Sequence, residues 1–107
     1  MMIHVGFEDD DRYDRMRRFE WMDIDRIQSA RCMVVGAGAL GNEVIKDMVL
    51  AGFKRITVVD MDDIVPSNLS RCLFFREADV NVSGKAEIVA QRGIELDPSC
   101  SITGMHS

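Results

Sequence analysis

The sequence predicts an α/β fold, in which a mostly parallel sheet is flanked by helices. Apolar runs at 31–36 and 55–60 each have the length of a buried strand, and segments with helical spacing of apolar residues follow them. A glycine-rich turn joins the first run to its helix. Strands that alternate with helices are typical of a parallel, doubly wound sheet. Such a sheet has about six strands, so we expect a truncated first half of the domain.

The residues before the sheet are predicted to be helical. Tyr13, Met16 and Phe19 recur every three residues among arginines, which predicts an amphipathic helix over about 11–20. The acidic run at 8–11 precedes it, where negative charge favours a helix start. A second short helix is expected over 22–29. We therefore divide the chain into a helical segment at 1–30 and a sheet-containing unit at 31–107.

Within the second unit, residues 31–36 read as a parallel strand that is buried on both faces, because the run is almost continuously apolar. Leu40, Val44 and Met48 have helical spacing, and Gly52 supplies the stop. A buried strand at 55–60 and an irregular loop at 62–71 are predicted next. A helix follows, with Ser83 as its cap and its end at Asp97-Pro98, and its apolar face is Ala86, Val89, Ala90 and Gly93. A further strand is expected to begin at 101–106.

Composition excludes several classes of function. The formal net charge of −5 argues against a nucleic-acid interface. No apolar run approaches the roughly 18 residues of a membrane span, so we expect a soluble, cytoplasmic protein. The three cysteines are widely spaced and form no CxxC pair, which indicates neither a zinc site nor a disulfide framework. Cys32 opens an apolar run, and we expect it to be buried.

The chemistry of the chain is concentrated in its glycine loop. Gly36 permits a tight turn off the strand, Gly38 lets the backbone approach a phosphate or ribose, and Gly41 lets the helix pack against the sheet. The start of that helix directs free N–H groups at an anion. Asp60 ends the next strand, where a Rossmann-like site places a carboxylate that accepts hydrogen bonds from ribose hydroxyls. A nucleotide site follows, but these residues fit NAD as well as ATP.

Several further motifs occur in register with the glycine loop. They are Asp60-x-Asp62, Ser67-Asn68-Leu69-x-Arg71, Gly84-Lys85-Ala86, and Arg12-Tyr13-Asp14-Arg15 near the start. In this combination the chain resembles the ThiF/MoeB/HesA and ubiquitin-activating enzyme superfamily over about residues 12–98. The unit 31–107 would then be the nucleotide-binding half of an adenylation domain.

The resemblance implies a role for each matched residue. Asp60 would hold the ATP ribose, and Asp62 would support either the ribose or the metal-facing side of the pocket. Asn68, Arg71 and Lys85 would face the triphosphate. Together with Gly36, Gly38 and Gly41 these residues would make up the nucleotide site. Arg71 and Lys85 would act in catalysis by stabilising the charge that builds on the phosphates. Arg15 would act in trans, since its counterpart in relatives reaches into the active site of the partner subunit.

The implied reaction is the ATP- and Mg²⁺-dependent adenylation of the C-terminal carboxylate of a ubiquitin-like or sulfur-carrier protein, with release of pyrophosphate. The implied assembly is a homodimer or a pseudo-symmetric heterodimer. The family's magnesium-binding aspartate would lie past residue 107, so this chain would supply ATP-binding elements only and no metal ligand. Alone it should be inactive.

Two alternatives remain open on the sequence. The chain could belong to an NAD(P)-dependent oxidoreductase, which would leave the match at 67–71 to chance. It could also be the catalytically silent scaffold subunit of a heterodimeric activating enzyme, although such a subunit has no need of phosphate ligands. One position departs from the family pattern, because Cys72 stands where a glutamine is usual. The sequence does not identify the carrier protein.

Overall fold

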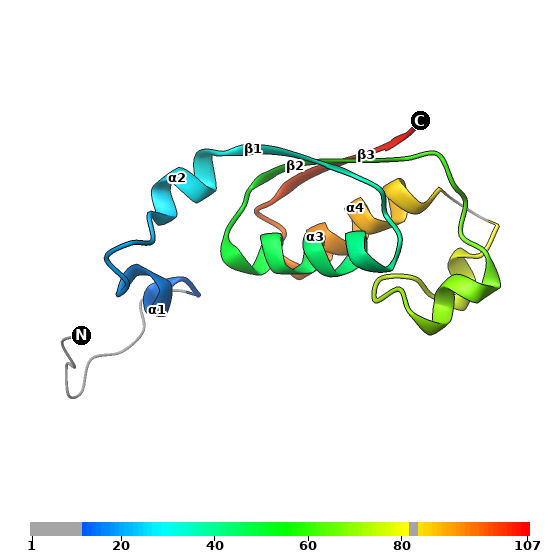
Figure 1. Cartoon of the computed structure of the whole chain (residues 1–107), viewed down its shortest axis with the longest axis horizontal. Coiled ribbons are helices and arrows are strands. Elements are labelled where there is room, and N and C mark those ends of the chain that lie inside the picture. Colours follow the sequence, from blue (N-terminus) through cyan, green and yellow to red (C-terminus); the bar gives the residue numbers. More distant parts are fainter. Residues whose placement is uncertain (1–11, 82–83) are drawn as a thin grey trace.

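The computed structural model describes residues 12–81 and 84–107 (Figure 1). Its elements are α1 (Asp14–Arg17), α2 (Ile24–Ser29), β1 (Arg31–Val35), α3 (Ala39–Ala51), β2 (Arg55–Asp60), the 3-10 helices η1 (Pro66–Ser70) and η2 (Glu77–Asp79), α4 (Lys85–Leu96) and β3 (Ser101–His106). The acidic run at 8–11 and the predicted cap Ser83 lie outside the described residues. In the described part, no helix is long and apolar enough to cross a membrane.

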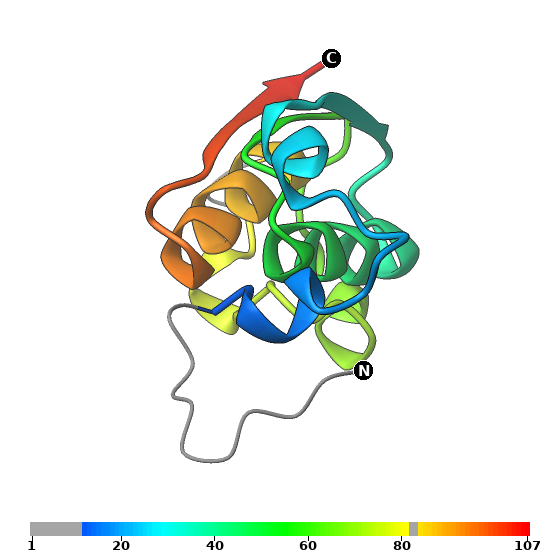
Figure 2. The same cartoon turned by 90° about the vertical axis from the view of Figure 1, so that its left-hand side faces the viewer.

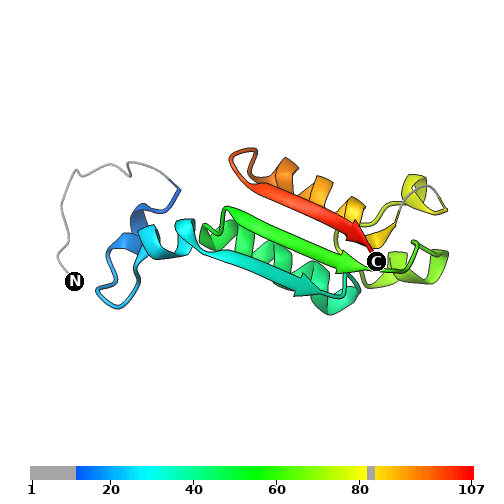
Figure 3. The ribbon, with the colours of Figure 1, turned by 90° about the horizontal axis from the view of Figure 1, so that it is seen from above.

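The three strands form one parallel sheet in the order β1-β2-β3 (Figure 3). The α/β fold class and the parallel sheet predicted from the sequence are therefore confirmed. The register aligns the more exposed residues of the strands in rows across the sheet. Arg31 pairs with Arg55 and Arg55 with Ser101 at the amino end, and Val35 pairs with Val59 and Val59 with Met105 at the carboxyl end.

One face of the sheet carries the hydrophobic core. Figure 2 looks from the amino ends of the strands and shows α3 and α4 together on that face. Ile45 and Val49 of α3, Val58 of β2 and Val89 of α4 are completely buried there. The predicted face of the last helix is confirmed, because Ala86, Val89, Ala90 and Gly93 are all buried.

The opposite face is uncovered, so the prediction of strands buried on both faces is wrong for the described residues. Met33 is 65% exposed, Val35 78% and Met105 46%. The reason lies in the topology. Consecutive right-handed crossovers between neighbouring parallel strands that progress in one direction place their helices on the same side of the sheet. Cys32, expected to be buried, is only half-buried.

The first helix is shorter than the prediction of about 11–20. It spans only Asp14–Arg17 and then gives way to turns, and Phe19 is 50% exposed and lies outside the core. Tyr13 and Asp14 turn inward, and the Asp14 carboxylate accepts a hydrogen bond from Arg18 at 2.7 Å. The three-residue repeat of apolar side chains therefore includes one buried residue, Tyr13, and does not form a continuous apolar face.

Candidate functional site

The glycine loop connects β1 to α3, and its geometry requires glycine at the first and third positions of the motif. Gly36 has a φ of 102°, in the left-handed region that favours glycine, and its N–H donates to the Val59 carbonyl at 2.7 Å. A Cβ on Gly41 would collide with the carbonyl oxygen of Gly36. A Cβ on Gly38 would meet nothing within 4 Å. Open space therefore lies over the middle of the loop, where a ligand could approach the backbone.

Asp60 lies against this loop from the end of β2. One carboxylate oxygen accepts a hydrogen bond from the N–H of Ala37 at 2.7 Å, and the other accepts from the N–H of Asp62 at 2.7 Å. Asp60 thus joins the glycine loop after β1 to the segment that follows β2, at the carboxyl edge of the sheet. A carboxylate oxygen has two lone pairs, so these backbone bonds leave acceptor positions for hydroxyl groups of a ligand.

Asp62, which donates to Asp60, also contacts Lys85. The backbone N–H of Lys85 donates to the Asp62 carbonyl at 2.9 Å, and Lys85 Nζ lies 3.9 Å from an Asp62 carboxylate oxygen. An antiparallel bridge between Asp63 and Gly84 holds the two segments together. The Lys85 side chain is only 13% exposed. The described contacts therefore bring Gly38, Asp60, Asp62 and Lys85 to one edge of the sheet.

Asn68 and Arg71 belong to η1 and its end. Asn68 is buried, and its side-chain oxygen accepts a hydrogen bond from the Val65 N–H at 2.9 Å, which leaves its NH₂ group as a donor. Arg71 is exposed, and its Nη1 donates to the Ser67 carbonyl at 3.0 Å. Within the described residues no hydrogen bond or ion pair joins Arg71 to Asp60 or Asp62, so the described contacts do not tie Arg71 to the group at the edge of the sheet.

Asn42 is a site residue that the sequence reasoning missed. It is fully buried, and its Nδ2 donates to the carbonyls of Ala37 and Gly38, each at 2.8 Å. Its Oδ1 accepts from the N–H of Phe74 at 2.8 Å. One amide thus joins the glycine loop to the segment that follows Arg71. The available signal was the position of a polar residue on the apolar stripe of α3, in line with the buried Ile45 and Val49.

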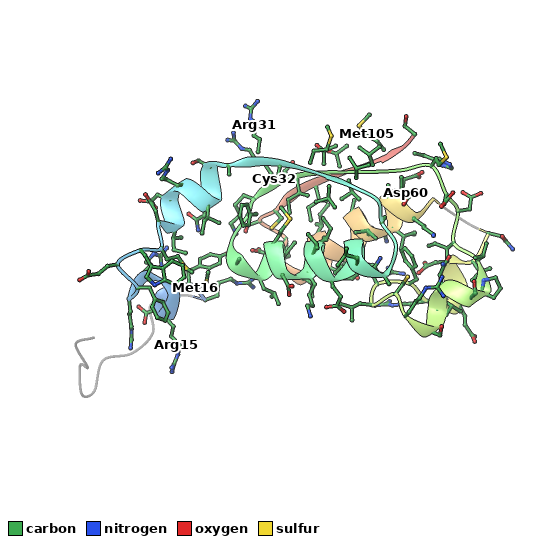
Figure 4. All side chains as sticks on the ribbon, viewed as in Figure 1. Arg15, Met16, Arg31, Cys32, Asp60 and Met105 are labelled. Carbon is green, nitrogen blue, oxygen red and sulfur yellow. The ribbon has the colours of Figure 1, made fainter. Side chains whose placement is uncertain are left out.

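Arg15 lies at the other end of the molecule. Figure 4 labels Arg15 next to α1, at the end of the molecule where the strands begin, and Asp60 near the carboxyl ends of the strands. The side chain of Arg15 is exposed. The structure therefore does not bring Arg15 together with the other predicted site residues of its own chain.

The residues at the carboxyl edge of the sheet suit a ligand that carries phosphate and hydroxyl groups. It presents a carboxylate, a glycine loop with open space above it, the start of α3 without a side-chain cap, and a largely buried lysine. A hollow of about 390 Å³ runs along the loop on the β1 side, lined by residues that include Val35, Gly38 and Leu40. Among the described residues no cluster of histidine, cysteine or acidic side chains could hold a metal ion.

Comparison with known proteins gives consistent matches. The model of the ThiF family matches residues 12–107. SUMO-activating enzyme subunit 2 of Dictyostelium discoideum is 40% identical over 82 residues, which are 77% of this chain and 12% of that protein. The NEDD8-activating enzyme E1 catalytic subunit of Caenorhabditis elegans is 42% identical over 81 residues, which are 76% of this chain and 19% of that protein. The chain thus spans less than a fifth of the length of these two relatives.

Solved structures of the same fold include two proteins of E. coli. MccB, crystallised with ATP, superposes with a TM-score of 0.75 at 26% identity over 78% of this chain and 25% of its own. TcdA, a tRNA N6-threonylcarbamoyladenosine dehydratase in complex with ATP, gives a TM-score of 0.73 at 28% identity over 78% of this chain and 34% of its own. The chain therefore matches between a quarter and about a third of these structures.

Proposed function

Because the chain belongs to the ThiF family, we propose that it provides the nucleotide-binding part of an enzyme that adenylates the C-terminal carboxylate of a ubiquitin-like or sulfur-carrier protein. The reaction would consume ATP, require Mg²⁺ and release pyrophosphate. The observation that carries the proposal is the position of Asp60, which bonds the glycine loop through Ala37 and lies next to the Asp62–Lys85 pair. Two relatives of the same fold were solved with ATP.

Different residues would contact different parts of ATP. Asp60 would accept hydrogen bonds from the ribose hydroxyls, and the space over Gly38 would admit the phosphates against the backbone. The uncapped start of α3 would direct N–H groups and the positive end of its dipole at them. Lys85, which is largely withdrawn from solvent, would place a compact positive charge beside the phosphates.

The chemical step would be a displacement at the α-phosphorus. An oxygen of the carrier's carboxylate forms the new P–O bond, and the bond to the bridging oxygen breaks, so that pyrophosphate leaves with the electron pair. Negative charge accumulates on the leaving group, which Lys85 and Arg71 would stabilise. Bound Mg²⁺ would neutralise part of the same charge. The NH₂ group of Asn68 would donate to a phosphate oxygen.

Arg15 would complete the site of a second subunit. Its place at the end of the molecule opposite Asp60 fits delivery to a neighbour better than action in its own site. We therefore include a dimer in the proposal, built from two copies or from this chain and a similar partner. A guanidinium lent across an interface would stabilise the transition state in the manner of an arginine finger.

The ThiF-family matches favour this function over an NAD(P)-dependent oxidoreductase, and calorimetric titration of the full-length protein tests the choice. We expect saturable binding of ATP in the presence of Mg²⁺ and none of NAD or NADH. Tight binding of NAD with no response to ATP would overturn the proposal.

The silent-scaffold alternative predicts a different pattern, which pyrophosphate exchange measures. An active enzyme should exchange labelled pyrophosphate into ATP only when its carrier protein is present. A silent subunit would show no exchange with any carrier, even in a preparation that is folded.

A further inference from the structure

A buried polar cluster holds α1 to the amino edge of the sheet. Lys54, just before β2, donates hydrogen bonds to the hydroxyl oxygen of Tyr13 at 2.7 Å, to the carboxylate of Asp97 at 2.8 Å and to Ser99 Oγ at 2.6 Å. The Tyr13 hydroxyl in turn donates to Asp97 at 3.1 Å. Tyr13 and Asp97 are both buried. We name Tyr13, Lys54 and Asp97 the anchor.

The surrounding backbone is shaped to receive Tyr13. Gly52 ends α3 with a φ of 110°, and a Cβ at this position would lie only 3.2 Å from the Tyr13 ring. Lys54 Nζ lies 5.0 Å from the centre of the same ring, within the range of a cation–π contact. The anchor thus joins α1 to the ends of α3 and α4 and to the start of β2.

The anchor stays charged over the physiological pH range. Burial disfavours the charged form of Asp97, but hydrogen bonds from Lys54, Ser99 and Tyr13 outweigh it and hold the pKa of Asp97 well below its ordinary value. Burial also lowers the pKa of Lys54, but its bonds to Asp97 and Tyr13 outweigh this and raise it. The stabilisation from Asp97 is lost only as pH falls below about 4, and that from Lys54 only as pH rises above about 10.

The position of Arg15 follows from the anchor. Tyr13 is the N-cap residue of the short helix that carries Arg15, so its attachment sets where that helix begins. We propose that Tyr13, Lys54 and Asp97 are positioning residues for Arg15, which hold α1 in the place from which Arg15 reaches the site of a second subunit. This inference rests on the proposed function, and specifically on the action of Arg15 in trans.

Turnover and ATP affinity should separate in an anchor variant. Lys54→Met in the full-length protein keeps the length of the side chain and removes its charge, far from the glycine loop. We expect pyrophosphate exchange to fall by about 10- to 100-fold, the effect of misplacing a catalytic group by about 1 Å, while the affinity for ATP stays unchanged. Lys46→Met is the matched control and should change neither quantity, because the half-buried Lys46 of α3 pairs with Glu43 and takes no part in the anchor. Equal losses of affinity and turnover would show a merely structural role and overturn the inference.

A milder variant covers the case in which Lys54→Met, which leaves Arg12 Nη1 at 3.3 Å as the remaining described cation on Asp97, does not fold. Tyr13→Phe removes only the hydroxyl group and keeps the packing against Gly52. It should lower exchange in the same way by a smaller factor. Unchanged exchange in folded Tyr13→Phe together with unchanged exchange in any folded Lys54 variant would overturn the inference.

Mixed dimers distinguish this inference from the function on which it rests. An isolated heterodimer of Arg15→Ala and Lys85→Ala subunits has one site with both defects and one with neither, so exchange should recover toward half of the wild-type level. A Lys54→Met subunit should complement Lys85→Ala in the same way, because its defect also appears in the neighbour's site. If the Arg15 pair recovers and the Lys54 pair does not, the anchor inference is wrong. If neither pair recovers, action in trans is wrong and the inference fails with it.

Attachment of α1 can be measured without activity. Trp21 is the only tryptophan in the chain and lies shortly after α1, where it is 76% exposed. Part of its fluorescence anisotropy should decay quickly in the wild type, through motion of the exposed side chain, and the rest with the rotation of the whole molecule. The fast component should be larger in Lys54→Met and unchanged in Lys46→Met. Identical decays in a folded Lys54→Met protein would show that the anchor does not hold this segment.

Discussion

At the level of single residues, Asp60 and Lys85 lie at one edge of the sheet and offer opposite charges to a ligand. Asp60 is tied to the backbone of the glycine loop and of Asp62, so its orientation is fixed before a ligand arrives. Among the described residues Lys85 Nζ forms one weak ion pair, 3.9 Å long, with Asp62. On the proposed function Asp60 recognises the sugar and Lys85 the phosphates. The two roles predict different losses of affinity across ligands that contain one or both of these parts.

Substitution of the two residues should therefore affect ligands differently. Asp60→Ala should weaken ATP, AMP and adenosine alike, by about 1–3 kcal/mol, the scale of a hydrogen bond to a charged group. Lys85→Ala should weaken ATP strongly and leave adenosine nearly unchanged, because its partner is the phosphate charge. Calorimetric titration of the three ligands measures both effects. Equal losses for ATP and adenosine in Lys85→Ala would show that its role is misassigned.

Asn42 shows why part of the site could not be predicted at this scale. The positions of Gly36, Gly41 and Asp60 were predictable, because each has a local signature in a strand–loop–helix context. The hydrogen bond that the Phe74 N–H donates to Asn42 joins residues 32 positions apart. A contact of that kind depends on how the loop folds back over α3, which no local spacing encodes.

At the level of elements, the start of α3 decides how closely the helix approaches β1. Glycine within a helix costs about 1 kcal/mol relative to alanine, so Gly41 needs a compensating reason. The carbonyl of Gly36 supplies it, since a side chain on Gly41 would collide with that oxygen. Gly38 has no such neighbour and a φ of −78°, which alanine also adopts. The two glycines thus serve packing and ligand access respectively.

Alanine at each glycine should separate stability from binding. Gly41→Ala should lower the free energy of unfolding by about 1–3 kcal/mol, because overpacking outweighs the gain in helix propensity. Gly38→Ala should leave unfolding nearly unchanged but weaken ATP by about tenfold, or about 1.4 kcal/mol, because its Cβ enters the space proposed for the phosphates. Urea denaturation and ATP titration measure the two quantities. A stable Gly41→Ala protein would contradict the packing argument, and unimpaired ATP binding in Gly38→Ala would contradict the ligand assignment.

The elements themselves were predictable to different degrees. The strands, α3 and α4 were predicted with nearly their observed bounds, because flanking glycines and Asp97-Pro98 mark their ends. The first helix was predicted too long, since Phe19 is apolar but packs beside Trp21 at the surface, with ring centres 5.6 Å apart. Hydrophobicity alone does not distinguish an apolar residue in the core from one on an exposed surface.

At the level of the whole molecule, the uncovered face of the sheet is the feature that sequence reasoning got wrong. The row at the amino end of this face contains Arg31 and Arg55, and the row at the carboxyl end consists of Val35, Val59 and Met105. An apolar run in a strand predicts burial on both faces, but whether both faces are covered depends on the number and hand of the crossovers around the strand.

A pair of identical substitutions on the two faces tests this asymmetry. Val35→Thr, on the uncovered face, should change the free energy of unfolding by less than about 0.5 kcal/mol and reduce the binding of a hydrophobic dye. Val58→Thr, on the helical face, buries a hydroxyl group among apolar side chains and should cost about 1–3 kcal/mol. Thermal denaturation and dye fluorescence report the two effects. Equal destabilisation by both changes would mean that Val35 is covered in solution.

The uncovered face also bears on the fate of this chain inside a cell. Chaperones and proteases continuously sort proteins by stability, and exposed apolar surface is a mark of incomplete folding and an aggregation hazard. A row that includes Val35 at 78% exposure and Met105 at 46% would present that mark even when the core is correctly formed. The cellular lifetime of the protein would therefore depend on how quickly another layer of protein covers this face of the sheet.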